Sequence, residues 1–566
     1  MTALDWTVLA VSLIFIIAYG IYKSRGVATM DSYVLSNRDM RWWTVAISIM
    51  ATQASAITFI STPGQGYADG MRFVQFYFGL PLAMVLLCIT AVPFYRHLQV
   101  YTAYEFLEKQ FDLKTRTLAS FLFLIQRGLG AGLTIYAPSL ILSLLLGWNL
   151  VLTNLLIGGL VIIYTTTGGA RAVNWTQFHQ MMIILTGMAA AFVTVIALLP
   201  DGISVNDALH LAGSQGKMNT VDFTWDWDNR YTLWSGLIGG FFLQLSYFGT
   251  DQSQVGRYLT GQSIAQTRLG LLTNGLLKIP MQFLILLLGV MVFAFYQFTM
   301  PPVFFNRLET ERIYQSSYAA DYVRLENDHA GLFKRQQEIL HVWNAAKESG
   351  DEMRMEQQEA NLRDINKQMA AVKEKAKDLI KAHDPSANTN DTNYIFLTFV
   401  LDYLPVGLVG LIIAAIFAAS MSSTSAELNA LASTTVVDIY RRMFRSDASD
   451  AHYVRVSKWA TVFWGAFAVG FAELAGQLGS LIEAVNILGS LFYGTILGIF
   501  LLAFYWKKVG GTSAFTAAII AEVIVFLCYF FTPISFLWYN VIGCALVVGL
   551  AWVIYFFRQK TTLFQG

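Results

Sequence analysis

Long apolar segments recur along the chain and are separated by shorter polar stretches. Each holds roughly 20 mainly apolar residues, which is the length that a helix needs to cross the hydrocarbon core of a bilayer. The pattern predicts thirteen membrane-spanning helices, near residues 5–23, 42–62, 72–95, 116–147, 150–167, 173–199, 232–251, 266–298, 393–440, 451–474, 478–505, 511–532 and 534–557. The sequence therefore predicts an all-α polytopic membrane protein.

The composition agrees with a membrane protein. Of the 566 residues, 55% are hydrophobic and 13% are charged, whereas soluble domains carry about 25% charged residues. The net charge of +1 is not the basic footprint of a nucleic-acid-binding protein, so no nucleic-acid partner is expected. The three cysteines, Cys88, Cys528 and Cys544, lie inside apolar segments and form neither a disulfide framework nor a metal-binding spacing.

Basic residues mark alternate loops between the predicted helices. One side receives Lys23, Arg25, Arg38, Arg41, Arg96, Lys109, Lys114, Arg116, Arg171, Arg257, Arg268, Arg441 to Arg445, Lys507, Lys508, Arg558 and Lys560, and the other receives an acidic loop. Because cytoplasmic loops carry an excess of Lys and Arg, we expect the N-terminus outside and the C-terminus inside. The first apolar segment has its basic residues after it, which is the reverse of a secretory signal, so we expect it to be retained.

One long region is polar and highly charged, and the alternation of loops places it outside. Its centre, residues 319–383, lacks proline, and Ser349, Gly350 and Asp351 read as the turn of a helical hairpin. Two interpretations remain open for this insert. It is either a solvated hairpin standing on the outer face, or a lid or docking element for an unknown partner.

Two of the predicted spans are interrupted by polar residues at mid-depth. The span 42–62 carries Thr52, Gln53, Ser55 and Thr58, and the span 232–251 carries Gln244, Ser246, Tyr247 and the sequence Gly249-Thr250-Asp251. Polar side chains at that depth are costly in lipid and face a cavity as a rule. The two spans are the first helices of two five-helix sets. Such matching interruptions point to an inverted-repeat transporter with its site near the midplane.

The predicted spans divide the chain into a core of two repeats and additional segments. We expect an extra N-terminal helix and inner loop at 1–41, a first repeat at 42–199, an outer loop at 200–231, a second repeat at 232–505 containing the hairpin insert at 300–392, and two extra C-terminal helices at 506–566.

The stretch 414–442 has small and hydroxyl-bearing residues at positions where a membrane helix is usually apolar. Ala419, Ser422 and Ser423 are spaced i, i+3, i+4 and so share one helix face. A carbonyl and two hydroxyls, with no nearby carboxylate, make a weak oxygen site that suits sodium better than a transition metal, which prefers imidazole or thiolate. The alternative is that these small residues simply allow close helix packing.

Three other polar residues lie inside predicted spans, and each has an expected role. Arg127 lies among glycines and either binds an anionic solute or is a structural arginine satisfied by helix-end carbonyls, and we favour the second. Glu483 and Asn486 lie closer to the interior and are placed to line a solute path.

Several motifs together resemble one known family. They are WWTVAISIMATQASAITFIS, Gly168-Gly169 followed by Ala172-Val173 and Trp175-Thr176, YFGTDQSQVGRYL, and LPVGLVGLIIAAIFAASMSSTSAELNALASTTVVDIY. In this order and inside such a chain, they resemble the sodium–solute symporter family, which includes sodium/glucose, iodide, monocarboxylate and sialic acid cotransporters. The resemblance covers about residues 1–505 apart from the insert.

The resemblance implies a broken-helix inverted-repeat fold, the LeuT fold, with alternating access and Na⁺ as the coupling ion. Carried onto this chain, the sodium would meet the carbonyls of Ala51, Ala54 and Ala419 and the hydroxyls of Ser422 and Ser423. The gating tyrosine of sugar-carrying members corresponds to Tyr247. The expected solute and gate residues are Gln53, Thr58, Gln75, Tyr77, Gln244, Tyr247 and Asn486.

The departures from the family pattern bear on stoichiometry and solute. Some members hold a second sodium with an aspartate at the position of Gln177, and hydroxyls that here correspond to Ser425 and Ala426. A neutral amide lacks the Coulombic attraction for the ion, so we expect one sodium per cycle and at most a remnant of a second site at Gln177 and Ser425. Tyr77 replaces the acidic contact of the sugar carriers, which makes a hexose less favoured.

The expected function is therefore sodium-coupled import of a small organic solute, such as a sugar, polyol, monocarboxylate or sialic-acid-like molecule. We expect a multi-pass protein of the plasma (inner) membrane that is not an enzyme and needs no organic cofactor. A proton-coupled carrier or an ion channel on the same fold is the alternative. Proton coupling would require a titratable group at mid-depth, whereas the expected ion site offers only carbonyls and hydroxyls.

Overall fold

A computed structural model of the chain describes residues 1–23 and 38–564, with the side chains of residues 21, 23, 167–172, 174, 175 and 560–564 left out. The motif residues Gly168, Gly169, Ala172 and Trp175, and the basic residues Lys23, Arg25, Arg171 and Lys560, thus lie outside the described side chains. All the regular elements in the described part of the chain are helices, with one isolated backbone bridge between Met40 and Gly261.

The helices before the hairpin are α1 (Ala3–Lys23), α3 (Trp42–Gln53), α4 (Ala56–Asp69), η2 (Gly70–Tyr77), α5 (Leu80–Ile89), α6 (Ala91–Leu98), α7 (Glu105–Gln110), α8 (Leu113–Leu146), α9 (Leu150–Ala197), α10 (Val205–Ser214), η3 (Ser235–Gly239), α11 (Gly240–Thr250), α12 (Gln252–Tyr258), α13 (Ile264–Phe298) and α14 (Arg307–Tyr314). They are followed by α15 (Ala319–Ser349), α16 (Glu352–His383), α17 (Thr392–Tyr403), α18 (Leu408–Thr434), η4 (Thr435–Phe444), α19 (Asp450–Ala475), η5 (Gly476–Leu478), α20 (Leu481–Tyr505), α21 (Gly511–Phe531) and α22 (Phe536–Phe564).

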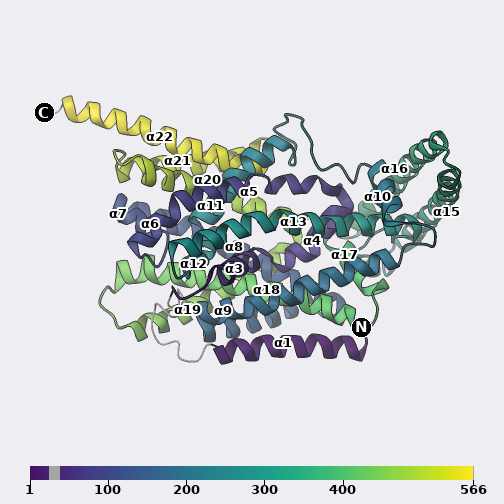
Figure 1. Cartoon of the computed structure of the whole chain (residues 1–566), viewed down its shortest axis with the longest axis horizontal. Helices are drawn as coiled ribbons and strands as arrows, with labels where there is room; N and C mark the ends of the chain where they lie inside the picture. The colour runs from purple at the N-terminus through teal and green to yellow at the C-terminus, as the bar shows by residue number, and fades with distance from the viewer. Residues whose placement is uncertain (24–37, 565–566) are drawn as a thin grey trace.

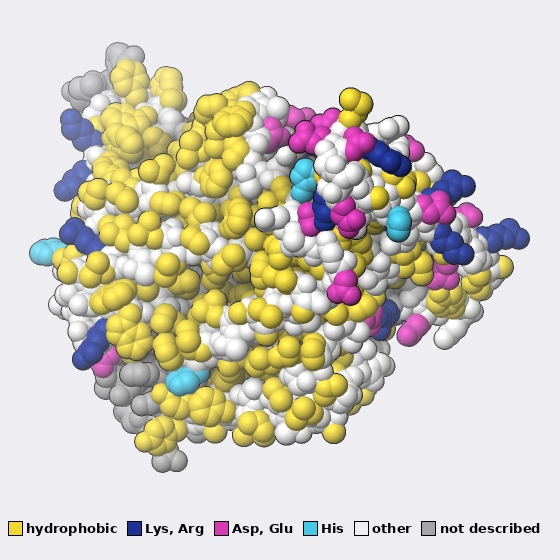
Figure 2. Space-filling model, turned by 45° about the vertical axis from the view of Figure 1, so that its right-hand side comes forward, with side chains coloured by type: hydrophobic (Ala, Val, Ile, Leu, Met, Phe, Trp, Pro, Cys, Tyr) yellow, Lys and Arg dark blue, Asp and Glu magenta, His cyan; other side chains and the backbone are white. Residues whose placement is uncertain are grey.

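Most long helices run along the longest axis of the molecule (Figure 1). The N-terminus and the hairpin α15–α16 lie toward one end, and the C-terminus lies at the other. Ten helices in the described residues are long and apolar enough to cross a membrane. Hydrophobic side chains cover the body, whereas charged side chains gather over the hairpin and Lys and Arg line the opposite edge (Figure 2). The protein is a multi-pass membrane protein; the count of thirteen spans and the side on which each terminus lies stay predictions.

Both predicted interruptions are real breaks. The helix α3 ends at Gln53, Ser55 has extended backbone (φ −82°, ψ 171°), and α4 begins at Ala56. Further along the chain, α11 ends at Thr250, and Asp251 is extended (φ −78°, ψ 119°). The Asp251 carboxylate accepts a hydrogen bond from the Ser253 amide and caps α12, which is the usual role of aspartate at a helix start.

The spans predicted at 150–167 and 173–199 form the two halves of α9. A straight helix would separate Tyr164 from Thr176, twelve residues on, by about 18 Å. The two hydroxyls nevertheless share a hydrogen bond, so α9 turns back on itself. The first half contacts α19 through Asn154 and Glu473 (2.9 Å), and the second half contacts α3.

The single span predicted at 393–440 is wrong. The structure divides it into α17 and α18, with Pro405 and Gly407 between them, and Gly407 has a φ of 90° that favours glycine. Proline has no amide donor and removes a helical hydrogen bond, and Gly407 leaves the helical conformation, so the two residues together end the run. Asp402 in the last turn of α17 was the one polar sign of this break in the sequence.

The predicted hairpin is confirmed. Gly350, with φ 73°, ends α15 in the left-handed conformation, which is the favoured helix stop, and Asp351 caps α16. The hairpin does not stand alone, because Leu340, Trp343 and Leu362 pack with Leu211 of α10. The loop expected at 200–231 thus includes a helix that supports the hairpin.

Candidate functional site

The predicted sodium ligands meet where α18 crosses the break between α3 and α4. The Ser55 amide donates to the Gln53 carbonyl (3.1 Å), instead of continuing the regular α-helical pattern to Ala51. The Ala51 carbonyl accepts a hydrogen bond from the Ser422 hydroxyl (3.1 Å). Ala51, Ala54 and Ser422 are all buried. The structure therefore places a bent-helix carbonyl and an α18 hydroxyl in direct contact.

The other two predicted ligands lie one turn apart on α18. The Ser423 hydroxyl donates to the Ala419 carbonyl (3.0 Å) and also to the Ser420 carbonyl (3.3 Å). A serine hydroxyl rotates and keeps two lone pairs, so both hydroxyls of this face can turn their oxygens toward a cation. The face has the oxygen chemistry of a weak alkali-metal site.

The expectation that no carboxylate lies near this face is wrong. Glu427, one turn beyond Ser423, is buried and accepts a hydrogen bond from Thr134 (3.1 Å). It also forms an ion pair with Arg127 (3.0 Å). The i, i+4 spacing from Ser423 already placed this carboxylate on the same helix face, whereas its partners Thr134 and Arg127 belong to α8, which is distant in sequence.

A cavity of about 80 Å³ lies beside this face. Six of the predicted solute and gate residues line it, namely Gln53, Thr58, Tyr77, Gln244, Tyr247 and Asn486. The cavity is smaller than the roughly 300–1,000 Å³ of ordinary ligand pockets, so it must widen to admit a solute. The structure brings most of the predicted solute residues into one polar chamber.

Gln75 lies elsewhere. Its amide nitrogen donates to the Tyr231 carbonyl (2.9 Å), and its amide oxygen accepts from the Asp222 amide (2.9 Å). It therefore ties η2 to the loop 200–231 and does not line the cavity. Glu483 is likewise engaged at that loop, through an ion pair with Arg230 (2.6 Å).

Arg127 is satisfied by carboxylates and not by helix-end carbonyls, so that expectation is wrong. Its guanidinium pairs with Asp251 at the break between α11 and α12, and with Glu427 on α18. It also donates to the Tyr493 hydroxyl (2.6 Å) and lies 5.4 Å from the centre of the Tyr247 ring. This cluster links the second broken helix to the helix that carries the oxygen face.

Lys278 is a further cation that the sequence analysis missed. It is fully buried on α13, and its Nζ lies 5.8 Å from the centre of the Tyr77 ring. In the described part of the chain this ammonium has no hydrogen-bond partner. A buried charge without a partner is costly, which sets Lys278 apart from the paired charges around Arg127.

Gln177 does not meet Ser425. Its amide oxygen accepts from the Ser48 hydroxyl (2.6 Å), and its amide nitrogen donates to the Thr52 hydroxyl (3.0 Å). The Ser425 hydroxyl instead donates to the Ser422 carbonyl (3.0 Å). Gln177 thus fastens α9 to α3 next to the break.

We expect Gln177→Ala to destabilise the protein more than Gln180→Ala does. Both glutamines are fully buried on α9, but the Gln180 amide has no hydrogen-bond partner in the described residues. The difference between the two variants in free energy of unfolding reports the two hydrogen bonds of Gln177 and should be about 1–2 kcal/mol. Thermal unfolding of the two purified variants measures it, and equal melting temperatures would contradict the fastening role of Gln177.

The two broken helices, the oxygen face of α18 and the enclosed polar cavity define a secondary-transporter core. The sequence model of the sodium:solute symporter family matches residues 33–303 and 376–521. The chain therefore belongs to the sodium:solute symporter family, as its motifs suggested. The matched ranges leave out residues 304–375, which hold most of the hairpin.

Individual relatives agree. The chain is 26% identical to the sodium/sialic acid symporter SiaT of Proteus mirabilis, over 96% of this chain and 93% of the relative. It is 27% identical to the human sodium-coupled monocarboxylate transporter 1, over 88% of this chain and 68% of that one. A solved structure of a Na⁺-coupled sialic acid symporter superposes with a TM-score of 0.75 at 24% identity and covers 98% of both chains. The fold is thus the LeuT-like fold of that structure.

Proposed function

We propose that this protein is a sodium-coupled symporter of the plasma membrane that imports a small organic solute by alternating access, with one sodium per cycle. The observation that carries the proposal is the contact of Ser422 with the Ala51 carbonyl at the α3–α4 break. The same break supplies Gln53 and Thr58 to the cavity. An ion at the break can therefore change the shape of the solute cavity, which is the differential affinity that coupling requires.

The cavity lining supports a solute that carries hydrogen-bond donors. The side-chain amide oxygens of Gln53, Gln126 and Gln244 line the cavity, and in the described residues they are buried without a partner. An unsatisfied buried acceptor costs about 1–3 kcal/mol. A solute with hydroxyl or amide N–H groups would satisfy these acceptors, and a purely apolar one would not.

The relatives favour a solute with one negative charge. Lys278 does not line the cavity, so the charges beside it are those of Arg127, Asp251 and Glu427. A sodium at the break would balance these three formal charges, and the relatives therefore carry the inference about the charge of the solute. The names of the relatives, which include sialic acid and monocarboxylate symporters, fit this solute class.

The charge of the solute decides how strongly one sodium can concentrate it. For a neutral solute, a potential of −100 mV contributes about 2.3 kcal/mol and a tenfold sodium gradient about 1.4 kcal/mol, which together support roughly a 500-fold gradient. For a monoanion no net charge crosses, and the sodium gradient alone supports about a tenfold gradient.

Uptake into proteoliposomes after a sodium jump tests the proposal. We expect saturable uptake of an organic acid that carries hydroxyl or amide groups, with a sodium Hill coefficient near one and no stimulation by an inside-negative potassium diffusion potential. A Hill coefficient clearly above one would overturn the single-sodium stoichiometry. Uptake driven by a proton gradient without sodium, or a non-saturable sodium flux without solute, would overturn the symport mechanism.

A further inference from the structure

The hairpin α15–α16 covers a second, larger cavity at its own end of the molecule. The cavity has a volume of about 450 Å³, which lies within the range of roughly 300–1,000 Å³ for ligand pockets. Its roof is the hairpin, and its base is formed by the ends of α4 and α13 together with the segment after α10. We call it the hairpin vestibule.

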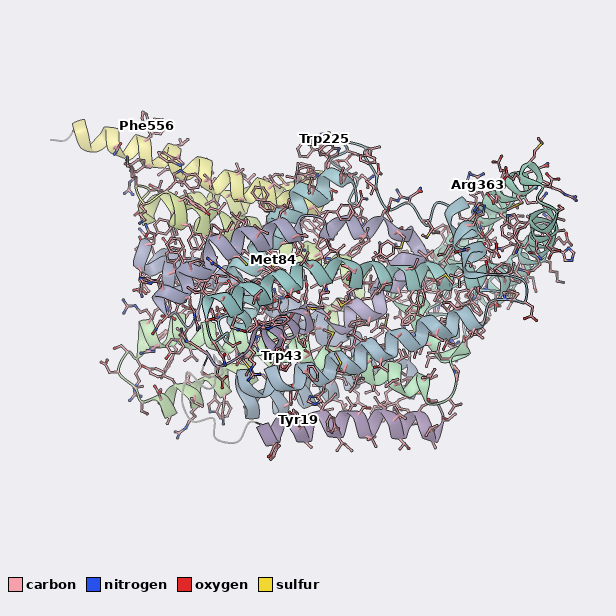
Figure 3. The ribbon with its side chains drawn as sticks, in the orientation of Figure 1. Tyr19, Trp43, Met84, Trp225, Arg363 and Phe556 are labelled. Carbon is pink, nitrogen blue, oxygen red and sulfur yellow. The ribbon has the colours of Figure 1, made fainter. Side chains whose placement is uncertain are left out.

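One wall of the hairpin vestibule is cationic. Arg363 and Lys367 lie one turn apart on α16, and Lys373 and Lys217 complete the set. Lys373 pairs with Asp391 (2.8 Å). In the part of the chain that the structure describes, neither Arg363 nor Lys367 has an ion-pair partner. Figure 3 shows Arg363 on the hairpin, at the end of the molecule away from Phe556.

Lys217 adds a buried positive charge at the base. Its Nζ lies 4.9 Å from the centre of the Phe293 ring. Burial lowers the pKa of Lys217 to about 8, although the nearby Asp69 opposes this shift. His329 adds no charge near neutrality, because burial and the adjacent Lys373 lower its pKa to about 4. Four cations therefore face two carboxylates, Asp391 and Asp69, which leaves two positive charges in excess.

The remaining lining suits an organic molecule. The Gln336 amide donates to Gln297 (2.6 Å), and the Asn366 amide donates to Gln215 (3.1 Å). Gln336 is 1% exposed, and its amide oxygen has no partner among the described residues. These amides offer hydrogen bonds to hydroxyl or N–H groups, beside aromatic side chains that pack against the body of a ligand.

The base of the vestibule is continuous with the central site through one helix. Tyr67 near the end of α4 packs edge-to-face on Phe293 and Phe305, with ring centres 5.5 Å and 5.7 Å apart. The same helix begins at Ala56, next to the break, and carries Thr58 into the central cavity. The 14 residues of α4 make a rod of about 21 Å that joins the two chambers.

We propose that the hairpin completes an outer vestibule that receives the transported solute, a small organic acid, before it enters the central cavity. The proposal rests on the proposed function and narrows the solute to carboxylate-bearing molecules. The family match stops at residue 303 and resumes at 376, so the roof of this chamber is an addition to the shared transporter core. An excess of positive charge in a cleft raises the local concentration of an anion and its rate of association.

The test compares two double variants of the full-length chain in proteoliposomes. Arg363→Gln with Lys367→Gln removes the unpaired cations of the vestibule. Arg354→Gln with Lys375→Gln removes the same charge from positions of α16 that do not line it. At low ionic strength we expect the vestibule variant to raise the KM for an organic acid about fivefold, with maximal rate and sodium dependence unchanged. The difference should shrink at high salt, and the control should behave like the wild type.

Measuring solute binding directly tests the hairpin vestibule independently of transport. Calorimetry on the purified protein without sodium would use pyruvate, a sialic acid, glucose and inorganic phosphate as probes. We expect both organic acids to bind the wild type and the control more tightly than the vestibule variant, and glucose to show no such difference. Equal affinities in the two double variants would overturn the proposal, and so would a site that takes phosphate but neither organic acid. If the vestibule variant bound organic acids more weakly but the wild type showed no sodium-driven uptake, the binding role of the hairpin vestibule would stand and the proposed symport would be rejected.

Discussion

Ser422→Ala and Ser423→Ala should each raise the sodium concentration for half-maximal uptake by roughly 10- to 100-fold. A hydrogen bond or equivalent contact to a charged group is worth about 1.5–3 kcal/mol, and each 1.4 kcal/mol is a factor of ten in affinity. Ser422 contacts the Ala51 carbonyl across the break, and Ser423 lies on the same face of α18. Sodium titrations of initial uptake rates measure the shift, and saturating sodium should restore much of the rate.

Two serines on the same helix serve as controls. The Ser433 hydroxyl donates to the Ala430 carbonyl of its own helix (3.0 Å), so Ser433→Ala should leave the sodium dependence unchanged. Ser425→Ala distinguishes one sodium per cycle from two. If a second ion bound at Gln177 and Ser425, this variant would have a lower sodium Hill coefficient than the wild type. If both Ser422→Ala and Ser423→Ala kept the wild-type sodium dependence, the ion site would lie elsewhere.

Local patterns predicted much of the fold. Hydropathy placed most membrane helices, because each must be apolar over the bilayer thickness. The polar residues around Ser55 and the Gly249-Thr250-Asp251 sequence predicted both breaks, since polar groups inside a membrane face a cavity. The prediction failed at 393–440, where Pro405 and Gly407 interrupt a mainly apolar run and Asp402 is the only charged residue near the break.

The candidate site was predictable where its residues share one element and not where they meet across elements. The i, i+3, i+4 spacing placed Ala419, Ser422 and Ser423 on one face. No spacing could pair Arg127 with Glu427, which lies 300 residues away. The role of Gln75 was misassigned for the same reason, because its partners belong to a loop whose path the sequence does not reveal.

The buried charge cluster bears on the alternative of proton coupling. Glu427 is a buried titratable group beside the expected ion site, which the sequence analysis did not expect and which a proton-coupled carrier would need. It is held by Arg127 and Thr134 and is therefore already engaged in a structural ion pair. Substituting Glu427 therefore distinguishes the two roles. If Glu427 only holds the ion pair, uptake in the variant still depends on sodium. If Glu427 carries the coupling proton, the variant changes which ion drives uptake.

Arg127→Gln should be among the most destabilising single changes in the chain. It would leave Asp251 and Glu427 buried close together without their counter-ion, and breaking a buried pair in this way costs about 3–5 kcal/mol. We expect a lower yield of folded protein, a melting temperature lower by several degrees, and loss of transport. Arg324→Gln, which breaks an exposed pair with Asp321, is the control and should change stability by less than about 1 kcal/mol.

Neutralising the whole cluster should cost less than breaking it. In the triple variant Arg127→Gln, Asp251→Asn and Glu427→Gln, no unpaired charge remains, so we expect its melting temperature to lie above that of Arg127→Gln alone. Transport should stay lost, because the cluster joins the break at Asp251 to the helix that carries Ser422 and Ser423. Glu427→Gln alone keeps the pair of Arg127 with Asp251 and should be milder than Arg127→Gln. A triple variant less stable than the single one would show that hydrogen-bond geometry, and not charge balance, holds these three helices together.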